Sequence, residues 1–326
     1  MTSTAPSCLA ESLNEALGQL MENDESVVLI GQDIGRLGGV FRVTKGLQKR
    51  FGPSRVRDAI LAESSIVGQA IGMSLSGLTP VCEIQFDGFI YPAMNQIVTQ
   101  AARMTTRWND DLTLNLVIRV PVGGGIRAVE HHSESNEAYF AHTPGLHVAF
   151  PSSPSDAAAM LKSSCLLGSP VIFYEPKRLY WKRKRQPREL SEPVSALSAR
   201  VVRRGSDITV VGFGALLEEV LAAADLVAST VDVEVVDLRW IAPMDTETVL
   251  ASVARTGRLL VVHEAVGFGG VGAELVATVA EHGSNHLRSP MRRLAPPRRI
   301  YPPADYESRH LIGVSQIAGA IEEMCT

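Results

Sequence analysis

The chain has 326 residues, of which 45% are hydrophobic, and a formal net charge of −4. This length allows two α/β domains of ordinary size, and the composition excludes a disordered chain and a nucleic-acid partner recruited by bulk charge. The N-terminal residues lack the basic start of a leader, and no apolar run is long enough to span a bilayer, so we expect a cytoplasmic protein without membrane contact. Four scattered cysteines lack the paired spacing of a zinc site, and we expect them to be reduced: Cys8, Cys82, Cys165 and Cys325.

Helical and strand patterns alternate through the first half of the chain. Leucines recur at helical spacing from Leu9 to Leu20 and predict an opening amphipathic helix. Further helices are expected after residues 63, 93 and 153, the last opened by a Ser-Pro-Ser-Asp sequence. Strands are expected at residues 27–30, 80–86, 112–120, 146–150 and 171–174.

The composition changes after residue 176. Residues 177–188 are basic, and we expect them to form a solvated or partner-facing surface. A stretch rich in Ser, Glu and Pro then predicts an interdomain connection. The second half alternates again, with strands at 208–211, 231–236 and 259–262 and helices at 216–228, 246–254 and 271–282. We therefore predict two α/β domains with mostly parallel sheets, at residues 1–187 and 201–326, joined by a linker at 188–200.

The stretch from Leu61 to Gly88 organises the first half. Glu63 is a single acid after a short apolar run, and Gly68, Ala70 and Gly72 follow it at the spacing of one helix face. We expect Glu63 to lie between this helix and a buried strand, where poor solvation would let its carboxyl hold or share a proton. A residue that activates a cofactor needs a carboxyl group that can hold or share a proton in this way. The alternative is an ordinary acid in the first turn of a helix.

Three glycine-rich segments follow predicted strands or open helices. Residues 121–136 form a polar loop with three consecutive glycines and two adjacent histidines, and α/β proteins place chemistry in such loops. Residues 212–214 begin a pattern typical of dinucleotide binding but lack its third glycine. Residues 267–272 satisfy G-x-G-x-x-G, yet no acid at the end of a further strand supports them. Nicotinamide binding is therefore only a weak alternative.

Five motifs, in order along nearly the whole chain, resemble those of the β-subunits of thiamine-diphosphate-dependent 2-oxo acid dehydrogenases. The resemblance implies a transketolase-like pyrimidine-binding domain followed by a transketolase C-terminal-type domain that binds no nucleotide. The motifs are LAESSIVGQAIG (61–72), VCEIQFDGFIYPAMNQIV (81–98), VEHHSESNEAYFAHTPGL (129–146), FYEPKRLYW (173–181) and VVHEAVGFGGVGAEL (261–275).

The resemblance also implies roles for individual residues. Glu63 matches the glutamate that hydrogen-bonds the aminopyrimidine ring of thiamine diphosphate and favours its imino tautomer. Gln85 and Phe89 match positions that line this ring. Phe89 is often tyrosine in relatives, so stacking is kept here while a hydroxyl contact is lost.

The two adjacent histidines are expected to differ in role. His132 matches the active-site histidine that serves acyl transfer to lipoamide. His131 and His142 are expected to be supporting or structural residues. The catalytic residues implied by the resemblance are therefore Glu63 and His132.

The chain also departs from the wider family. It lacks the GDG motif and paired asparagines that hold Mg²⁺ and diphosphate, so the resemblance implies that a separate α-subunit holds them. The implied assembly is an α2β2 heterotetramer with the cofactor at each α/β interface, docked on a lipoyl acyltransferase core. Several relatives bind a structural potassium ion after the cysteine matching Cys165. That segment is one residue shorter here, so we predict no metal ligand in this chain.

The reaction implied is oxidative decarboxylation of a 2-oxo acid with reductive acylation of lipoamide. Residues 83–98 and 131–142 look closer to branched-chain enzymes, of the 3-methyl-2-oxobutanoate type, than to pyruvate enzymes. A pyruvate or acetoin dehydrogenase β-subunit is the alternative. A non-catalytic docking subunit of the same fold is a further one, but it would need neither Glu63 nor His132.

Overall fold

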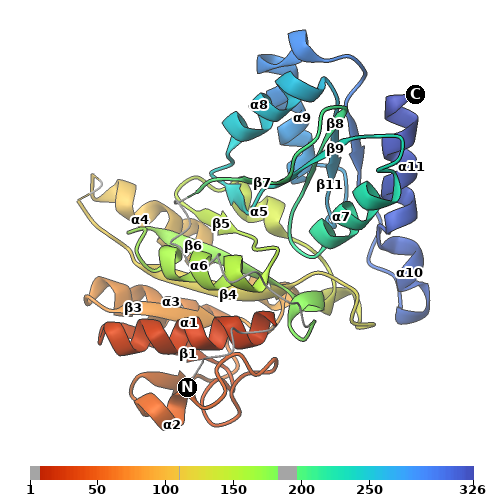
Figure 1. Cartoon of the computed structure of the whole chain (residues 1–326). Coiled ribbons are helices and arrows are strands. Elements are labelled where there is room, and N and C mark those ends of the chain that lie inside the picture. The colour runs from red at the N-terminus through yellow and green to blue at the C-terminus, as the bar shows by residue number, and fades with distance from the viewer. Residues whose placement is uncertain (1–7, 110, 183–196) are drawn as a thin grey trace, which may run out of the picture.

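The computed structural model describes residues 8–109, 111–182 and 197–326, which form two helix-covered sheets (Figure 1). The strands of the first sheet are β1 Val27–Gly31, β2 Val56–Asp58, β3 Thr79–Glu83, β4 Leu116–Val122, β5 His147–Ala149, β6 Pro170–Pro176 and β10 Trp240–Ala242. Those of the second are β7 Arg200–Arg203, β8 Ile208–Gly212, β9 Val233–Asp237, β11 Leu259–Val262 and β12 Arg292–Leu294.

The first sheet has seven strands in the order β10-β5-β6-β4-β3-β1-β2. All neighbours are parallel except β10, which comes from the second half of the chain and pairs antiparallel with β5. Its central strands β3, β4 and β6 are buried along their whole length, as parallel strands covered on both faces must be.

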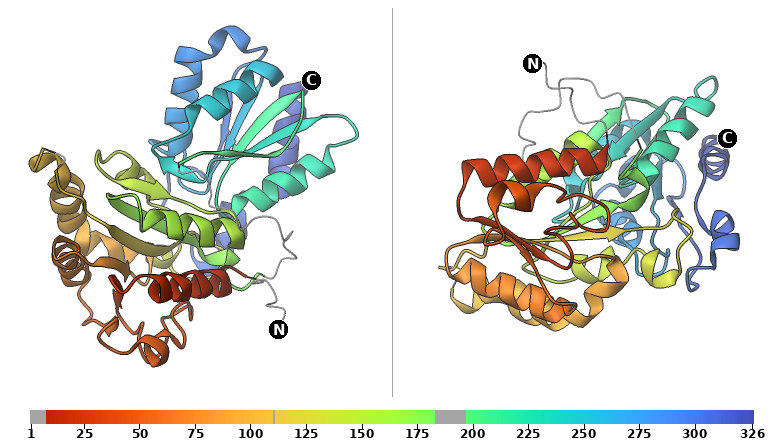
Figure 2. Two further views of the ribbon diagram at one scale, coloured as in Figure 1. Left: turned by 60° about the vertical axis from the view of Figure 1, so that its left-hand side comes forward. Right: turned by 90° about the horizontal axis from the view of Figure 1, so that it is seen from below.

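Helices cover both faces of this sheet (Figure 2, right). Leu9, Leu13 and Leu17 lie on one side of α1 and are fully buried, so this stripe faces the sheet and α6. Ser153 caps α6, because its hydroxyl accepts a hydrogen bond from the backbone N–H of Asp156. The helical segments of this half are α1 Leu9–Asn23, α2 Leu47–Phe51, α3 Glu63–Leu75, η1 Asp87–Ala93, η2 Asn95–Ala101, α4 Ala102–Arg107, η3 Glu130–His132, α5 Glu137–Ala141, α6 Pro154–Ser164 and η4 Lys177–Leu179.

The second sheet has the order β12-β11-β8-β9-β7, and only β7 is antiparallel to its neighbour. The apolar sides of α7 and α11 pack on one face, while α8 and α9 share a core with the first domain. The helical segments are α7 Leu216–Leu226, α8 Thr246–Thr256, α9 Val271–His282, η5 Ser284–His286, η6 Ala304–Tyr306, α10 Glu307–His310 and α11 Val314–Cys325.

The two sheets are joined by a continuous apolar core. One cluster of buried side chains runs from Ile66 of α3 through Val120 of β4 to Val249 of α8 and Val271 of α9. The pairing of β10 with β5 adds a backbone connection between the halves. The predicted class, two α/β domains with mostly parallel sheets, is confirmed.

The prediction for the basic run is wrong at its start. Lys177 is completely buried, and Arg178 is mostly buried between two carboxylates, because both side chains turn inward at the end of β6. Residues 183–196, which hold the rest of the run and most of the expected linker, lie outside the described residues. Within the expected linker, β7 already begins at Arg200.

Two further expectations from the sequence can be compared with the structure. Within the described ranges, no helix is long and apolar enough to cross a membrane. The four cysteines are free, and three of them are buried: Cys8, Cys82 and Cys165.

Candidate active site

The residues expected in the site follow the carboxyl ends of parallel strands. Glu63 opens α3, shortly after β2 ends. Gln85 and Phe89 come after β3, and His132 comes after β4. Since the carboxyl ends of parallel strands share one edge of a sheet, these positions gather along the same edge, which is where α/β folds bind ligands.

The ring of His132 packs against two phenylalanines. Its centroid lies 4.1 Å from that of Phe86 and 5.1 Å from that of Phe89. Its Nδ1 is buried and has no hydrogen-bond partner among the described residues. Burial, with smaller contributions from the positive charges of His131 and Lys177, lowers the pKa of His132. The structure therefore brings the rings of Phe89 and His132 together, and the lowered pKa favours the neutral form of the His132 imidazole.

A buried ion pair lies under this aromatic group. Lys177 Nζ is 3.0 Å from Asp87 Oδ1, and both side chains are fully buried. Lys177 Nζ also lies 5.6 Å from the centre of the Phe86 ring. Burial raises the pKa of Asp87 to about 7 despite the nearby ammonium, and lowers that of Lys177.

The backbone of Asp87 is also fixed from the other side. Asn136 Nδ2 donates to Asp87 O at 2.9 Å, and Tyr174 Oη donates to Asn136 Oδ1 at 2.5 Å. Asn136 thus ties the segment after His132 to the start of η1. This buried chain of hydrogen bonds fixes the two segments relative to each other.

The acid of β3 has a structural partner. Arg119 donates to Glu83 at 2.8 Å and to both oxygens of Glu175 at 2.6 and 2.8 Å, and all three side chains are buried. Tyr180 Oη donates to Glu175 at 2.5 Å. Glu83 is therefore part of an ionic network inside the sheet and is not directed to a ligand.

The sequence predicted that Glu63 would be buried between a helix and a strand, and the structure shows a more exposed position. It is half-buried, because it stands at the exposed start of α3, where Ile60 and Leu61 before it are 72% and 73% exposed. Among the described residues, no hydrogen bond or ion pair joins it to Gln85, Phe89 or His132. The α3 face behind it is open, since a Cβ on Gly72 would meet no described atom within 4 Å.

Gln85 is half-buried and makes one long contact, from its Nε2 to Gln32 O at 3.5 Å. Its amide therefore keeps most of its hydrogen-bonding capacity for another group. A carboxylate, an amide and an aromatic ring at one sheet edge suit the hydrogen-bonding edge and the flat face of a pyrimidine.

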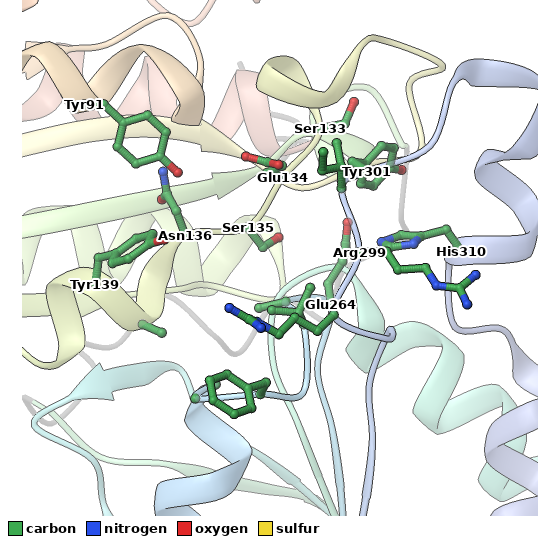
Figure 3. Close-up of a pocket in the computed structure, with 18 of the residues that line it drawn as sticks. Tyr91, Ser133, Glu134, Ser135, Asn136, Tyr139, Glu264, Arg299, Tyr301 and His310 are labelled. Carbon is green, nitrogen blue, oxygen red and sulfur yellow. The ribbon is translucent and has the colours of Figure 1, made fainter.

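A cavity of about 670 Å³ lies between the domains behind the His132 loop (Figure 3). Tyr91 and residues from three segments line it: 133–142, 264–270 and 298–310. Tyr91 and Asn136 point toward each other at one side of it, and Tyr301 and His310 stand at the other.

Comparisons with known proteins agree with this geometry. The family described as "Transketolase, pyrimidine binding domain" matches residues 8–182, and "Transketolase, C-terminal domain" matches residues 197–317. The "Pyruvate dehydrogenase E1 component subunit beta" of Acholeplasma laidlawii is 46% identical over 97% of both chains. The "3-methyl-2-oxobutanoate dehydrogenase subunit beta" of Mycobacterium tuberculosis is 42% identical over 97% of this chain and 91% of its own. The chain belongs to the β-subunit family of 2-oxo acid dehydrogenase E1 components.

Solved structures agree at the level of the fold. A "Split gene transketolase, inactive beta4 tetramer" superposes with a TM-score of 0.81 at 19% identity, covering 98% of this chain and 99% of that one. Membership of this thiamine-diphosphate-dependent family confirms the resemblance found in the five sequence motifs.

In this β-subunit, the two glycine patterns of the second domain serve internal packing. A Cβ on Gly214 would lie 2.4 Å from the ring of Phe150, and the Gly214 N–H donates to Ser152 Oγ at 2.8 Å. The second pattern surrounds the buried ring of His263, which lies within 2.8 Å of Cβ positions on Gly270 and Gly272. Protein atoms thus occupy the space beside Gly214, Gly270 and Gly272, whereas Gly269 is open and lines the cavity.

The β-subunit also contains a buried acid that sequence reasoning missed. Glu137 at the start of α5 is 1% exposed, and neither of its carboxyl oxygens has a described partner. Burial, reinforced by the charges of Glu264 and Asp87, raises its pKa to about 7. It stands within the quoted HHSESNEAYF motif, but nothing in the local pattern distinguishes it from an exposed acid in a helix's first turn.

Metal-binding groups were not predicted for this subunit. Among the residues described, no cluster of three or more His, Cys, Asp or Glu side chains is arranged for a metal ion. Cys165, at the position compared with a potassium site, is buried, and burial raises the pKa of its thiol to about 12.

Proposed function

We propose that this chain and an α-subunit together catalyse the oxidative decarboxylation of a branched-chain 2-oxo acid and the reductive acylation of lipoamide. The observation that carries this proposal is the His132 ring. It is held against Phe86 and Phe89 at the sheet edge where Gln85 and Glu63 also lie, and its Nδ1 lacks a protein partner.

Glu63, Gln85 and Phe89 would hold the pyrimidine end of thiamine diphosphate. When bound, this cofactor supplies the stabilised carbanion that decarboxylation of a 2-oxo acid requires. Glu63 would share a proton with the ring nitrogen of the pyrimidine, because its carboxylate carries no competing described hydrogen bond. Phe89 would pack on the ring, and the amide of Gln85 would orient it.

His132 would act in the transfer of the acyl group to lipoamide. Its lowered pKa favours the neutral imidazole near pH 7, so the ring would first accept a proton and then pass it to the lipoyl sulfur that is released when the S–S bond of the dithiolane breaks. Lys177 and Asp87 would act indirectly, by fixing the phenylalanines on which the imidazole rests.

An α-subunit would complete the site, with one cofactor at each α/β interface of an α2β2 heterotetramer. The support on this chain is the exposed surface beside Glu63, where Ile60 and Leu61 are 72% and 73% exposed, and at the far end of α3, where Leu75 is 49% exposed. Large exposed apolar side chains of this kind are typical of permanent interfaces. The α-subunit would hold Mg²⁺ and the diphosphate, and a lipoyl acyltransferase core would supply the lipoyl group.

The alternative is a pyruvate dehydrogenase β-subunit. Its support is the identity to the relatives named for pyruvate, 46% and 44%, against 42% for the relative named for 3-methyl-2-oxobutanoate. An acetoin dehydrogenase β-subunit or a docking subunit of the same fold has no comparable support.

The substrate test uses the complex of this chain with its α-subunit. We expect kcat/KM for 3-methyl-2-oxobutanoate to exceed that for pyruvate by at least about 10-fold, the discrimination that an apolar pocket gives for added methyl groups. The assay is decarboxylation coupled to an artificial electron acceptor. A preference for pyruvate would select the alternative, and turnover of neither would reject the proposed function.

A further inference from the structure

The polar loop that carries His132 is closed on itself. The backbone N–H of Gly123 donates to Glu134 O at 3.1 Å, so the two ends of the loop meet beside the end of β4. Inside it, Ser133 Oγ donates to Ala128 O at 3.3 Å, and the backbone N–H of His132 donates to Val129 O at 3.0 Å. Hydrogen bonds within the loop therefore make it a compact unit.

Two carboxylates of the second domain hold the glycine end of this loop. Glu264 accepts from the backbone N–H of Gly124 at 2.5 Å. Glu307 accepts from Gly125 at 2.9 Å and, through both oxygens, from Arg127 at 3.2 Å. The bond to Glu264 is short, and Glu307 is only 6% exposed. Charge-assisted bonds in such a buried place are stronger than bonds between neutral groups in water.

The glycines allow side chains of both domains to approach the loop closely. A Cβ on Gly124 would lie 1.8 Å from Tyr301 Oη, and a Cβ on Gly125 would lie 2.2 Å from Arg178 Cδ. Gly125 also has a φ of +87°, a backbone conformation that residues other than glycine rarely adopt. Tyr301 Oη in turn donates to Glu307 at 2.9 Å, so the acid is itself held in place.

The His132 end of the loop is held mainly by packing. His132 rests on Phe86 and Phe89, and Gly88 lies so close that a Cβ there would be 2.3 Å from His131 O. The imidazole Nδ1 has no described partner that would fix the ring by a hydrogen bond. The position of the ring therefore depends on the backbone of its loop.

We propose that Glu307 is a positioning residue for acyl transfer, because it fixes the loop that carries His132 from the opposite domain. This inference rests on the proposed function, in which His132 serves lipoamide. Glu307 would not touch the substrate or the cofactor. Its loss would leave the Glu63 side of the site unchanged, because α3 belongs to the first domain and shares no described bond with Glu307.

The test compares variants at Glu307 in the assembled α/β complex. Glu307→Ala should lower the rate of acyl transfer to a lipoyl domain at least about 10-fold, since a 1 Å displacement of a catalytic group can cost more. Decarboxylation with an artificial acceptor should fall less than about 3-fold, because the groups on the Glu63 side of the site are not displaced. Glu307→Gln keeps an acceptor oxygen for Gly125 and Tyr301, so it should restore most of the transfer rate.

Two further variants guard against misfolding and unspecific effects. Gly124→Ala should push the loop away from Tyr301 and give the same selective loss. Asp305→Asn is the matched control, because Asp305 pairs with the side chain of the same Arg127 at 3.1 Å but is fully at the surface. It should leave both half-reactions unchanged.

Hydrogen exchange gives a readout that does not require activity. Peptides covering residues 123–132 should exchange faster in Glu307→Ala, while those covering α1 and β6 should not change. Unchanged exchange in the loop, or an equal loss of both half-reactions with faster exchange throughout, would overturn the inference. If the unmodified complex turned over no 2-oxo acid, the proposed function would fail, and loop exchange alone would decide whether Glu307 holds the loop.

Discussion

The surroundings of His132 and of Glu63 differ in how much of the site this chain provides. His132 rests on two phenylalanines above a buried ion pair, and its loop is tied to both domains. Glu63 stands half-buried at an exposed helix start, beside exposed apolar side chains and on the same helix as Gly72, where an added Cβ would meet no described atom within 4 Å. In the proposed site, the surroundings of His132 are formed within the chain, whereas a partner would complete those of Glu63.

This difference indicates how the work is divided between subunits. A group that must keep a lowered pKa needs a preformed environment, and the buried cluster gives His132 that environment in the single chain. A group that meets a cofactor at a subunit interface gains its environment only on assembly. The two residues should therefore respond differently to mutation and to removal of the α-subunit.

The largest effect is expected at Glu63. Glu63→Gln in the α/β complex should lower turnover by at least about 100-fold, because the amide cannot share a proton with the pyrimidine. Stability should change little, since the side chain is half-exposed. The measurement is decarboxylation with an artificial acceptor, beside Glu247→Gln, which changes an exposed acid in the first turn of α8. Activity within a few fold of the unmodified complex would reject the role of Glu63.

At His132 we expect a selective effect. His132→Ala should lower acyl transfer to lipoamide by about 100-fold while changing decarboxylation only a few fold. Because the pKa of His132 is lowered, transfer by the unmodified enzyme should decline only at pH values below the ordinary histidine value of 6.5. Rates of both half-reactions across pH test this, with the exposed His282→Ala as control. Equal losses in both would mean that His132 acts before transfer.

A smaller effect concerns the buried acid next to this loop. The pKa of Glu137 is raised from 4.5 to about 7, so the folded state binds its proton more tightly than the unfolded chain does. The contribution of Glu137 to the free energy of unfolding is fully present below pH 4.5 and is lost as the pH rises through 7. Glu137→Gln should therefore reduce the fall in unfolding free energy between pH 4.5 and 8 by about 3 kcal/mol.

Denaturant unfolding of the purified subunit at several pH values measures this term. Asp87 and Asp237 have pKa values raised in the same direction, so part of the fall should remain in the variant. The control variant Glu247→Gln, at an exposed acid, should show the same fall in unfolding free energy as the unmodified chain. A slope in Glu137→Gln equal to that of the unmodified chain would show that Glu137 is already ionised in the folded state.

Sequence periodicity predicted the regular elements well. The helix expected at 271–282 coincides with α9, and the strand expected at 259–262 coincides with β11. The strand expected at 112–120 starts later, at Leu116, because residues 112–115, in which leucines alternate with Thr113 and Asn115, do not pair with a neighbouring strand. The pairing of β10 with β5 could not be predicted, since a three-residue strand some ninety residues from its partner carries no periodic signal.

The site was predicted only where a local pattern carries it. Glu63, Gln85, Phe89 and His132 stand in recognisable motifs, and their assignment stays a prediction until the variants are measured. The partners of Lys177 and the contacts of Glu307 depend on residues 90 and about 180 positions away, so no local pattern could reveal them.

Binding of thiamine diphosphate to the isolated chain tests the central claim most directly. Calorimetric titration with the cofactor and Mg²⁺ should show weak or no binding to this chain alone, and tight binding after the α-subunit is added. The reason is that the chain offers a carboxylate, an amide and an aromatic ring for one end of the cofactor, and no described cluster for Mg²⁺. Tight, magnesium-dependent binding by the isolated chain would contradict the account, because the site would then be complete without a partner.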